Sequence, residues 1–494
     1  MLSTITVYWC ILILKRVSKK KTKILCTIGP SSLSIKTLRK MFEAGMDGAR
    51  INTVFGNLQE FKEQIENVRS VSDLPILLDL RGVGIRTRIV GKWQVKKGDV
   101  ITSGFEGQSF GFNYDIIDQL DVGDLLFIDD GRIQMEIVKK EDKQIHLLMK
   151  NDGILEDRKG VNVPNKNLKV PIFSEEDLKI IDFANKHNIE FLGLSFTRSR
   201  DDILNLRKRL GNKNVSIIAK IENIQGVNNF EKILSEAQGI MIARGDLGVE
   251  IELEKVPLLQ KRLISMCNQH GKIVITATDM LDSMISQSTP TRAEVSDVAN
   301  AILDGTDVVM LSGETSIGKY PVKAVSVMAK IAEQAETLLV NKVKEREFHN
   351  ISRTVSRSVW QISETMPLNK VVTMTKTGYT ARMIARFKLK QPIIAVTANR
   401  VVKNQLALVY GVFPLLFEYE KEKDKILSVA KILCDRGVLE EDDTVLFTAG
   451  FRTYQKHSSN IIEIHTIKEL LEYSQKTMSL QQNNAGEVKR SHPQ

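Results

Sequence analysis

GIMIARGDLGVEI, at residues 239–251, begins as an apolar run, turns at residues 243–245 and then presents one carboxylate, Asp246. The apolar and small residues before the turn predict a strand that is buried on both faces. Gly245 and Gly248 allow the backbone amides to approach a ligand closely. We therefore expect Asp246 at the carboxyl end of a parallel strand, where α/β barrels and open sheets carry their active sites. The alternative is a plain strand-to-helix turn with a solvated aspartate.

The segment before it, IIAKIEN at residues 217–223, carries two charged residues. Lys220 and Glu222 are two residues apart, so on a strand their side chains face the same way. Burying both is costly unless they pair or bind something, so the segment predicts a structural ion pair or a ligand site. Glu222 and Asp246 can together give two hard oxygen ligands to Mg²⁺ or Mn²⁺. Lys220 would then neutralise charge on a transferring phosphoryl group or an enolate.

Strand-like and helix-like patterns alternate on both sides of these segments. The apolar runs lie at residues 23–29, 48–52, 75–80, 190–195, 215–221, 239–243, 273–278 and 307–311. Eight strand-then-helix units predict a closed parallel (β/α)8 barrel, or TIM barrel, with its active site at the carboxyl ends of the strands. Thr278 ends the seventh run, where its hydroxyl can bind substrate or orient a proton-donating water.

Two regions depart from the barrel pattern. Short alternating runs with turn signals at residues 87–170 predict an inserted small β-domain; the resemblance given below implies that it acts as a lid. Shorter strands at 370–375, 392–396, 413–417, 444–448 and 461–465 alternate with helices, which predicts a separate C-terminal open-sheet α/β domain; the resemblance given below implies that it is regulatory. The expected division is an N-terminal extension (1–20), the barrel (21–86 and 171–345), the β-domain (87–170), the C-terminal domain (350–475) and a disordered tail (476–494).

The composition narrows the class of ligand and the compartment. A net charge of +10 favours anionic ligands, whereas sparse aromatic residues and the lack of a nucleic-acid motif argue against nucleic acid. The four cysteines lie far apart, so we expect neither a disulfide framework nor a zinc site, and a cytoplasmic location fits best. The apolar run at residues 5–14 is shorter than the about 20 residues that span a membrane, so no membrane partner is expected.

Eight segments carry a resemblance to a known family: KTKILCTIGPSS, AGMDGARIN, KGVNVP, AKIENIQGV, MIARGDLGVEI, TATDMLDSM, PTRAEVSDVANAILDGTDVVMLSGETSIGKYP and PIIAVTAN. On these segments the chain resembles pyruvate kinase over about residues 21–465. The run at residues 290–321 is too long and specific to match by chance. The architecture of that family, a barrel interrupted by a β-domain and followed by a regulatory α/β domain, agrees with the division above.

The resemblance implies phosphoryl transfer between phosphoenolpyruvate and ADP, giving pyruvate and ATP, with Mg²⁺ or Mn²⁺. It implies that Lys220 stabilises the enolate and phosphoryl charge and that Glu222 and Asp246 hold the metal. The backbone amides of Gly245 and Asp246 would receive the substrate carboxylate.

Further roles follow from the same resemblance. Thr278 would work with Ser312 and a water in the proton step and would contact the substrate. Positions near the nucleotide phosphates match Arg50, Asn52, Arg86 and Lys159. Arginines and lysines at strand ends also lie on solvated rims without any ligand, and that alternative stays open for these four.

A loop in the C-terminal domain matches the family's effector site. Thr375, Thr377 and Thr380 lie in TKTGYT, and such hydroxyl-rich turns bind anions, although similar turns are common without ligands. The resemblance alone implies a sugar-phosphate or nucleotide effector and a homotetramer.

The chain departs from the family near the site for a monovalent cation. The family usually reads R-x-N-x-S-H-G, but here Val54 and Phe55 replace the serine and histidine. In the following motif, Leu80 and Gly84 stand where a threonine and a glutamate are common. The loss of hydroxyl and carboxylate oxygens removes possible ligands for a cation.

Only Asn52 and Asp79 then remain for K⁺, and we expect activity without it. Asp279 replaces a usual glutamine and adds an acid beside the anionic substrate, unless a cation pairs with it.

Three functions compete at this point. A kinase is favoured by the β-domain and by Arg86 and Lys159, because a lyase needs no nucleotide lid. A metal-dependent lyase or aldolase that acts through a pyruvate enolate would use the same carboxylates. A non-catalytic paralogue that binds metabolites is favoured by Val54, Phe55 and Gly84.

Overall fold

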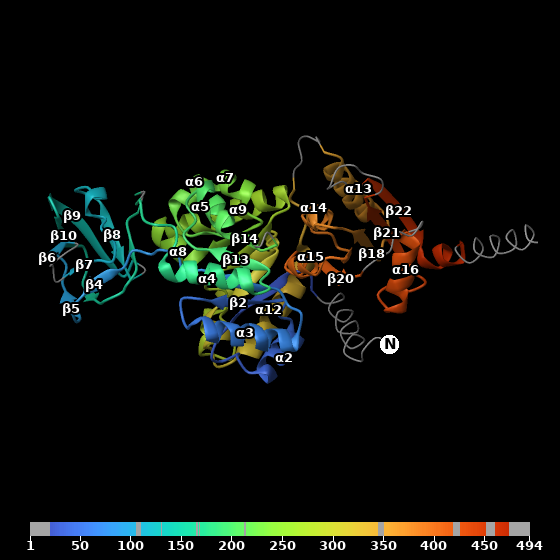
Figure 1. Cartoon of the computed structure of the whole chain (residues 1–494), viewed down its shortest axis with the longest axis horizontal. Helices are drawn as coiled ribbons and strands as arrows, with labels where there is room; N and C mark the ends of the chain where they lie inside the picture. The colour runs from blue at the N-terminus through green and yellow to red at the C-terminus, as the bar shows by residue number, and fades with distance from the viewer. Residues whose placement is uncertain are drawn as a thin grey trace, which may run out of the picture.

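The computed structural model describes residues 20–104, 110–129, 131–164, 166, 168–211, 214–343, 350–417, 425–450 and 460–473. The expected tail, and the expected extension except for its last residue, lie outside these residues. The described chain forms three bodies in a row: a β-domain, a central barrel and a C-terminal α/β body (Figure 1).

The central body is a closed barrel of eight parallel strands, as the sequence predicted. The strands are β1 (Lys23–Ile28), β2 (Gly48–Asn52), β3 (Ile76–Asp79), β13 (Phe191–Leu194), β14 (Ser216–Ile221), β15 (Gly239–Ala243), β16 (Ile273–Ala277) and β17 (Val308–Leu311). They follow one another round the barrel in chain order. Nearly every residue in them is buried, which explains why they appear in the sequence as continuous apolar runs.

Helices surround the barrel. They are α2 (Ile35–Ala44), α3 (Leu58–Val71), α4 (Glu175–Lys186), α5 (Arg200–Arg209), α6 (Ile224–Asn228), α7 (Phe230–Glu236), α8 (Arg244–Glu250), α9 (Val256–His270), α10 (Arg292–Leu303), α11 (Gly313–Ser316) and α12 (Pro321–Ala335). Capping boxes begin three of them, at Ser174, Ser199 and Thr291, each with an acidic residue three positions later. These caps fix where the chain re-enters a helix after a strand and its loop.

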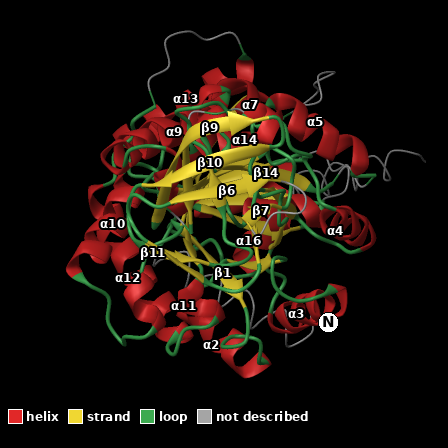
Figure 2. Ribbon diagram, turned by 90° about the vertical axis from the view of Figure 1, so that its left-hand side faces the viewer, coloured by secondary structure: helices red, strands yellow, loops and turns green. Residues whose placement is uncertain are grey.

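The inserted region forms a sheet with its own core. Seven strands lie in the order β12-β8-β9-β10-β6-β7-β4, and β5 (Trp93–Val95) pairs separately with β11 (Gly153–Leu155). The seven are β4 (Thr87–Ile89), β6 (Val100–Gly104), β7 (Phe110–Phe112), β8 (Leu125–Ile128), β9 (Ile133–Glu141), β10 (Gln144–Met149) and β12 (Val161–Asn162). Figure 2 looks from the side of this domain, with β6, β9 and β10 in front of the barrel. Asn162 donates a 2.7 Å hydrogen bond to Glu250 of α8, which follows β15, so the β-domain lies at the carboxyl end of the barrel strands.

The C-terminal body is an open sheet of five strands in the order β20-β19-β18-β21-β22. They are β18 (Lys370–Met374), β19 (Ile393–Thr397), β20 (Val412–Leu416), β21 (Thr444–Ala449) and β22 (Ile461–Thr466). The first four are parallel and β22 is an antiparallel edge strand. Its helices are α13 (Ile351–Thr365), α14 (Tyr379–Ala385), α15 (Arg400–Leu406) and α16 (Lys425–Asp435).

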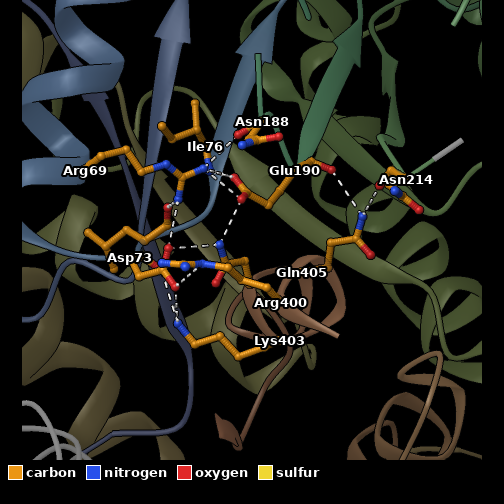
Figure 3. Close-up of polar contacts among 11 residues, drawn as sticks. Arg69, Asp73, Ile76, Asn188, Glu190, Asn214, Arg400, Lys403 and Gln405 are labelled. Carbon is orange, nitrogen blue, oxygen red and sulfur yellow. Dashed lines mark hydrogen bonds and ion pairs between the residues drawn. The ribbon is translucent and has the colours of Figure 1, made fainter. Parts of the chain in front are cut away.

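Polar side chains join this body to the amino end of the barrel (Figure 3). Glu190, just before β13, bonds Arg69 of α3 at 2.7 Å and Asn404 of α15 at 2.9 Å. Asp73 forms a 3.1 Å ion pair with Lys403, which also lies on α15. The C-terminal body and the β-domain therefore lie at opposite ends of the barrel. No helix of the described chain has the length and apolar character to cross a membrane.

Candidate active site

A buried lysine lies among oxygen atoms from three consecutive strands at the carboxyl end of the barrel. Lys220 Nζ is 2.9 Å from Glu222 Oε1 and 3.3 Å from Asp79 Oδ1, and it donates a 2.7 Å hydrogen bond to Ser195 Oγ. Burial alone would lower the pKa of Lys220, but Asp79 and Glu222 raise it above its usual value. Lys220 is therefore a cation at neutral pH.

Asp79 connects this lysine to a second cation. Its Oδ2 accepts from Arg50 Nε at 2.8 Å, and Arg50 Nη1 donates to Thr27 Oγ1 at 3.0 Å. Burial tends to raise the pKa of Asp79, but Lys220 and Arg50 lower it below the usual value. The sequence singled out Asp79 only as a doubtful ligand for K⁺, and here it is the shared counter-ion of two cations.

The two predicted metal ligands follow neighbouring strands. Glu222 comes directly after β14, and its Oε2 accepts the Phe196 amide at 2.6 Å. Asp246 is the third residue of α8, which follows β15, and its side chain is exposed. No group of three or more His, Cys, Asp and Glu side chains that could hold a metal occurs among the described residues. Two carboxylates with substrate and water oxygens suit a hard divalent cation, so the donor set fits Mg²⁺ or Mn²⁺.

The structure also brings together Gly245 and Thr278. The Gly245 amide donates to Thr278 Oγ1 at 2.8 Å, and that hydroxyl donates to the Ala277 carbonyl at 2.7 Å. Thr278 and Asp279 both adopt left-handed backbone angles, with φ of 66° and 53°. Residues with side chains rarely adopt such angles, and where they do the surrounding structure must hold them.

Arg244 provides that support, a role that the sequence alone did not reveal. Its guanidinium donates to the carbonyls of Thr278 at 2.6 Å and Ala277 at 3.3 Å, and it pairs with Asp297 of α10 at 2.6 Å. The only signal in the sequence was its position at the turn before Asp246, which did not reveal where the side chain points. Arg244 thus joins α8 to the loop after β16 and to α10 at the mouth of the barrel.

Ser312 follows β17, the strand next to β16, and its amide donates to Glu314 Oε2 at 2.7 Å. Thr278 and Ser312 therefore come after adjacent strands.

The four predicted nucleotide residues form two pairs in different bodies. Arg50 and Asn52 lie on β2 of the barrel, where Asn52 Oδ1 accepts the Val54 amide at 3.2 Å. Arg86 pairs through its backbone with Gly160, directly after Lys159. Lys159 Nζ lies 3.0 Å from Asp129 and 3.2 Å from Glu156, and hydrogen bonds to these carboxylates raise its pKa.

The residues that depart from the family lie in different environments. Val54 and Phe55 are exposed, with 74% of Phe55 accessible, on the loop after β2. Leu80 is buried in the core, and only its carbonyl faces the site, where it accepts from Ser195 Oγ at 2.8 Å. The expectation that Leu80 removes a side-chain ligand therefore needs correction, because that side chain points away from the site.

The threonine loop lies between β18 and α14. Thr375 Oγ1 accepts the Gly378 amide at 3.0 Å, and Thr375 and Thr380 are buried. Only Thr377 is exposed, so the effector site stays a prediction.

Comparison with known proteins identifies the family. Residues 19–325 match the model described as "Pyruvate kinase, barrel domain", and residues 353–465 match "Pyruvate kinase, alpha/beta domain". The chain belongs to the pyruvate kinase family.

Curated relatives and a solved structure agree with this. Pyruvate kinase of Geobacillus stearothermophilus is 41% identical over 92% of this chain and 81% of its own length. That of Thermococcus litoralis is 40% identical over 90% of this chain and 98% of its own length. The crystal structure of a pyruvate kinase from Cryptosporidium parvum superposes with a TM-score of 0.84 at 32% identity, covering 92% of this chain and 97% of that one. This family is one of enzymes, and its fold is the one described above.

Proposed function

We propose that the chain transfers a phosphoryl group from phosphoenolpyruvate to ADP, giving pyruvate and ATP. The observation that carries the proposal is the Lys220 ammonium, which lies between Asp79 and Glu222 at the carboxyl end of the barrel. A fixed cation in a buried site stabilises the charge that develops on the transferring phosphoryl group and on the enolate oxygen. Because Asp79 and Glu222 hold the ammonium in place, little reorganisation is needed as that charge develops.

Glu222 and Asp246 would hold Mg²⁺ or Mn²⁺. The ion, when bound, neutralises phosphate and enolate oxygens and orients the substrate. The Phe196 amide fixes one Glu222 oxygen, which orients the carboxylate. Val54 and the pairing of Asp79 with two cations support activity without K⁺.

The loops after β15, β16 and β17 would bind the organic part of the substrate. The Gly245 amide, which Thr278 Oγ1 accepts in this structure, would donate to the substrate carboxylate instead. The released Thr278 hydroxyl would, with Ser312, orient a water that protonates the enolate carbon, and the methyl group of pyruvate results.

Arg50 and Asn52 of the barrel and Arg86 and Lys159 of the β-domain support binding of the ADP phosphates. The resemblance also supports an anionic effector at Thr375, Thr377 and Thr380, a homotetramer and a cytoplasmic location. Sedimentation with and without a sugar phosphate would test the assembly and its response to an effector.

One experiment decides among kinase, lyase and non-catalytic binder. Purified protein is given phosphoenolpyruvate, ADP and Mg²⁺, and ATP and pyruvate are both measured. The kinase forms them in equal amounts, whereas a binder forms neither. A lyase or aldolase instead cleaves or joins carbon skeletons without ADP.

Lys220→Met then tests the assignment of the cation. We expect kcat to fall by about 10²- to 10³-fold, as when one stabilising donor is removed. Because Asp79 and Glu222 also lose their buried partner, the variant should melt at a lower temperature. Asp79→Asn is the matched control, since it disturbs the same buried cluster but keeps the ammonium. Turnover of Lys220→Met near that of the unsubstituted protein would refute the role of Lys220.

A further inference from the structure

The turn after β13 lies between the buried Lys220 and the segment that leads into the β-domain. This segment, residues 80–86, connects β3 to β4 and is called the linker below. Ser195 Oγ accepts the 2.7 Å hydrogen bond from Lys220 Nζ and donates to the Leu80 carbonyl at 2.8 Å. One hydroxyl group therefore holds both the ammonium and the start of the linker.

The next residue, Phe196, contacts the linker through its ring. A Cβ added to Gly82 would lie 2.8 Å from Phe196 Cδ2, whereas one added to Gly84 would lie 3.7 Å from Phe196 Cε2. The ring therefore lies against the backbone of the linker, and a side chain at position 82 would collide with it. Gly82 also has a left-handed φ of 70°, so both the space and the backbone require glycine there.

The backbone of Phe196 holds the proposed metal ligand. Its amide donates to Glu222 Oε2 at 2.6 Å, and its φ of 49° is left-handed, which is uncommon for a bulky residue. Such a conformation persists only where the surroundings hold it. Here the Thr197 hydroxyl closes the turn by donating to the Leu194 carbonyl at 2.8 Å, and the linker packs against the ring. The direction of the amide therefore depends on the packing of the ring.

We propose that Phe196 is a positioning residue that couples the linker to Glu222, so that the affinity for the divalent metal depends on how the linker packs. The linker acts through the turn, which aims the amide at one oxygen of Glu222 while Lys220 lies 2.9 Å from the other. Groups that orient a metal ligand change the affinity for the metal without touching it. The inference rests on the proposed role of Glu222 as a metal ligand.

Direct binding of Mn²⁺ to the full-length protein tests the proposal without a measurement of activity. Electron paramagnetic resonance measures the free Mn²⁺ during the titration. We expect Phe196→Leu to weaken binding by about tenfold, the lower end of the effect of losing a group that orients a ligand, because the amide itself remains. Phe191→Leu is the matched control, since Phe191 is buried at the start of the same strand. It should lower the melting temperature but leave Mn²⁺ binding unchanged.

Two variants of the linker test the same coupling from the other side. Gly82→Ala places a methyl group against the ring and should also weaken Mn²⁺ binding by about tenfold. Gly84→Ala makes the same chemical change, but its methyl group meets the ring at an ordinary contact distance and should have no such effect. If Phe196→Leu does not fold, this pair decides alone, and equal affinities in the two glycine variants would refute the coupling.

Coupling between two sites is reciprocal, so the metal should in turn affect the linker. The amides of Arg81 and Gly82 donate to Asp177 Oδ1 at 2.9 and 3.3 Å. We expect Mn²⁺ to slow hydrogen exchange of the linker in the unsubstituted protein but not in Phe196→Leu. Exchange that does not respond to Mn²⁺ in the unsubstituted protein would contradict the proposal.

Glu222→Gln separates failure of this inference from failure of the proposed function. If it leaves Mn²⁺ binding unchanged, Glu222 is not a ligand and both proposals lose their basis. If Glu222→Gln weakens binding but Phe196→Leu does not, or if Phe191→Leu weakens it equally, the coupling is refuted while the metal site stands.

Discussion

Asp279 places an extra negative charge beside the part of the site that should receive the substrate carboxylate. Its Oδ2 lies 3.5 Å from the point where a Cβ on Gly245 would be. Burial raises the pKa of Asp279 and Arg244 opposes that shift, while Asp282 and Asp297 raise the pKa further. The nearby cation therefore does not cancel the effect of burial and of the neighbouring acids.

Replacing this acid should improve substrate binding in a manner that depends on pH. We expect Asp279→Gln to lower KM for phosphoenolpyruvate by about three- to tenfold at pH 8, because one repulsive charge is removed. As pH falls toward the raised pKa, Asp279 takes up a proton and the advantage should shrink. At each pH between 5.5 and 8, the KM of the unsubstituted protein is divided by the KM of Asp279→Gln. Titration of phosphoenolpyruvate affects both values alike, so it cancels in this ratio. A ratio that stays constant, or a KM that does not change, would contradict the repulsion.

The two proposed metal ligands differ in burial, and this difference predicts different effects of mutation. Glu222→Gln and Asp246→Asn should each raise the Mg²⁺ concentration for half-maximal activity by about tenfold or more, because each removes one anionic ligand. Glu222 is buried and pairs with Lys220, so its variant should also melt several degrees lower, whereas exposed Asp246 should have little effect on melting. If neither variant alters the Mg²⁺ titration, the metal is held elsewhere.

At the scale of single elements, the loop after β2 explains why K⁺ should be dispensable. Arg81 donates to the carbonyls of Thr53 and Gly56, and the Thr53 hydroxyl donates to the Asp79 carbonyl at 2.6 Å. These bonds hold the loop, while the side chain of Val54 offers no oxygen. The ordering that a bound cation could provide is already supplied by Arg81.

We therefore predict less than a tenfold change in activity when K⁺ is replaced by tetramethylammonium at constant ionic strength, which separates binding from screening. Val54→Ser restores the missing hydroxyl and should create some dependence on K⁺. Leu80→Thr is the matched control, because that side chain lies in the core and should create none. A large loss without K⁺ in the unsubstituted protein would show that the ion binds after all.

Strands were the elements that the sequence predicted best. All eight barrel strands begin and end within one residue of their expected bounds, and so do the five strands of the C-terminal sheet. The reason is physical: a parallel strand that is buried on both faces is a short apolar run with polar residues at each end. The antiparallel direction of β22 could not be predicted in this way, because it depends on a connection and not on a pattern.

Side-chain partners across the mouth of the barrel were harder to predict. The pairing of Lys220 with Glu222 follows from their spacing, but Asp79 lies 141 positions before Lys220 in the sequence. Its pairing with both Lys220 and Arg50 depends on barrel closure. The direction of the Arg244 side chain could not be predicted either, since it is set by Thr278 in the loop after β16 and by Asp297 on α10.

At the scale of the whole molecule, the catalytic end of the barrel faces the β-domain and the other end docks on the C-terminal body. A buried ion pair joins that docked end: Lys388, before β19, lies 2.7 Å from Asp307, which precedes β17. Lys388 also lies 4.7 Å from the Tyr410 ring, and Asp307 accepts the Val274 amide at 3.0 Å. This ion pair and the contacts around it therefore join the C-terminal body to the barrel.

Breaking this pair should uncouple the two bodies. Lys388→Met leaves Asp307 buried without its cation, which we expect to cost about 3–5 kcal/mol of stability. Calorimetry should then show two unfolding transitions where the unsubstituted protein shows one, because fewer contacts hold the bodies together. Lys370→Met is the matched control, since Lys370 pairs with Asp443 inside the C-terminal body. It should lower stability without separating the transitions.

The double variant Lys388→Met with Asp307→Asn completes the argument. Replacing both partners removes the uncompensated charge, so the double variant should be more stable than Lys388→Met alone, and the two effects should not add. The left-handed backbone at Lys388, with a φ of 54°, is kept in every variant, so strain there cancels in the comparison. Additive losses would mean that Lys388 and Asp307 act independently. The connection between the bodies would then depend on the Glu190 and Asp73 bonds instead.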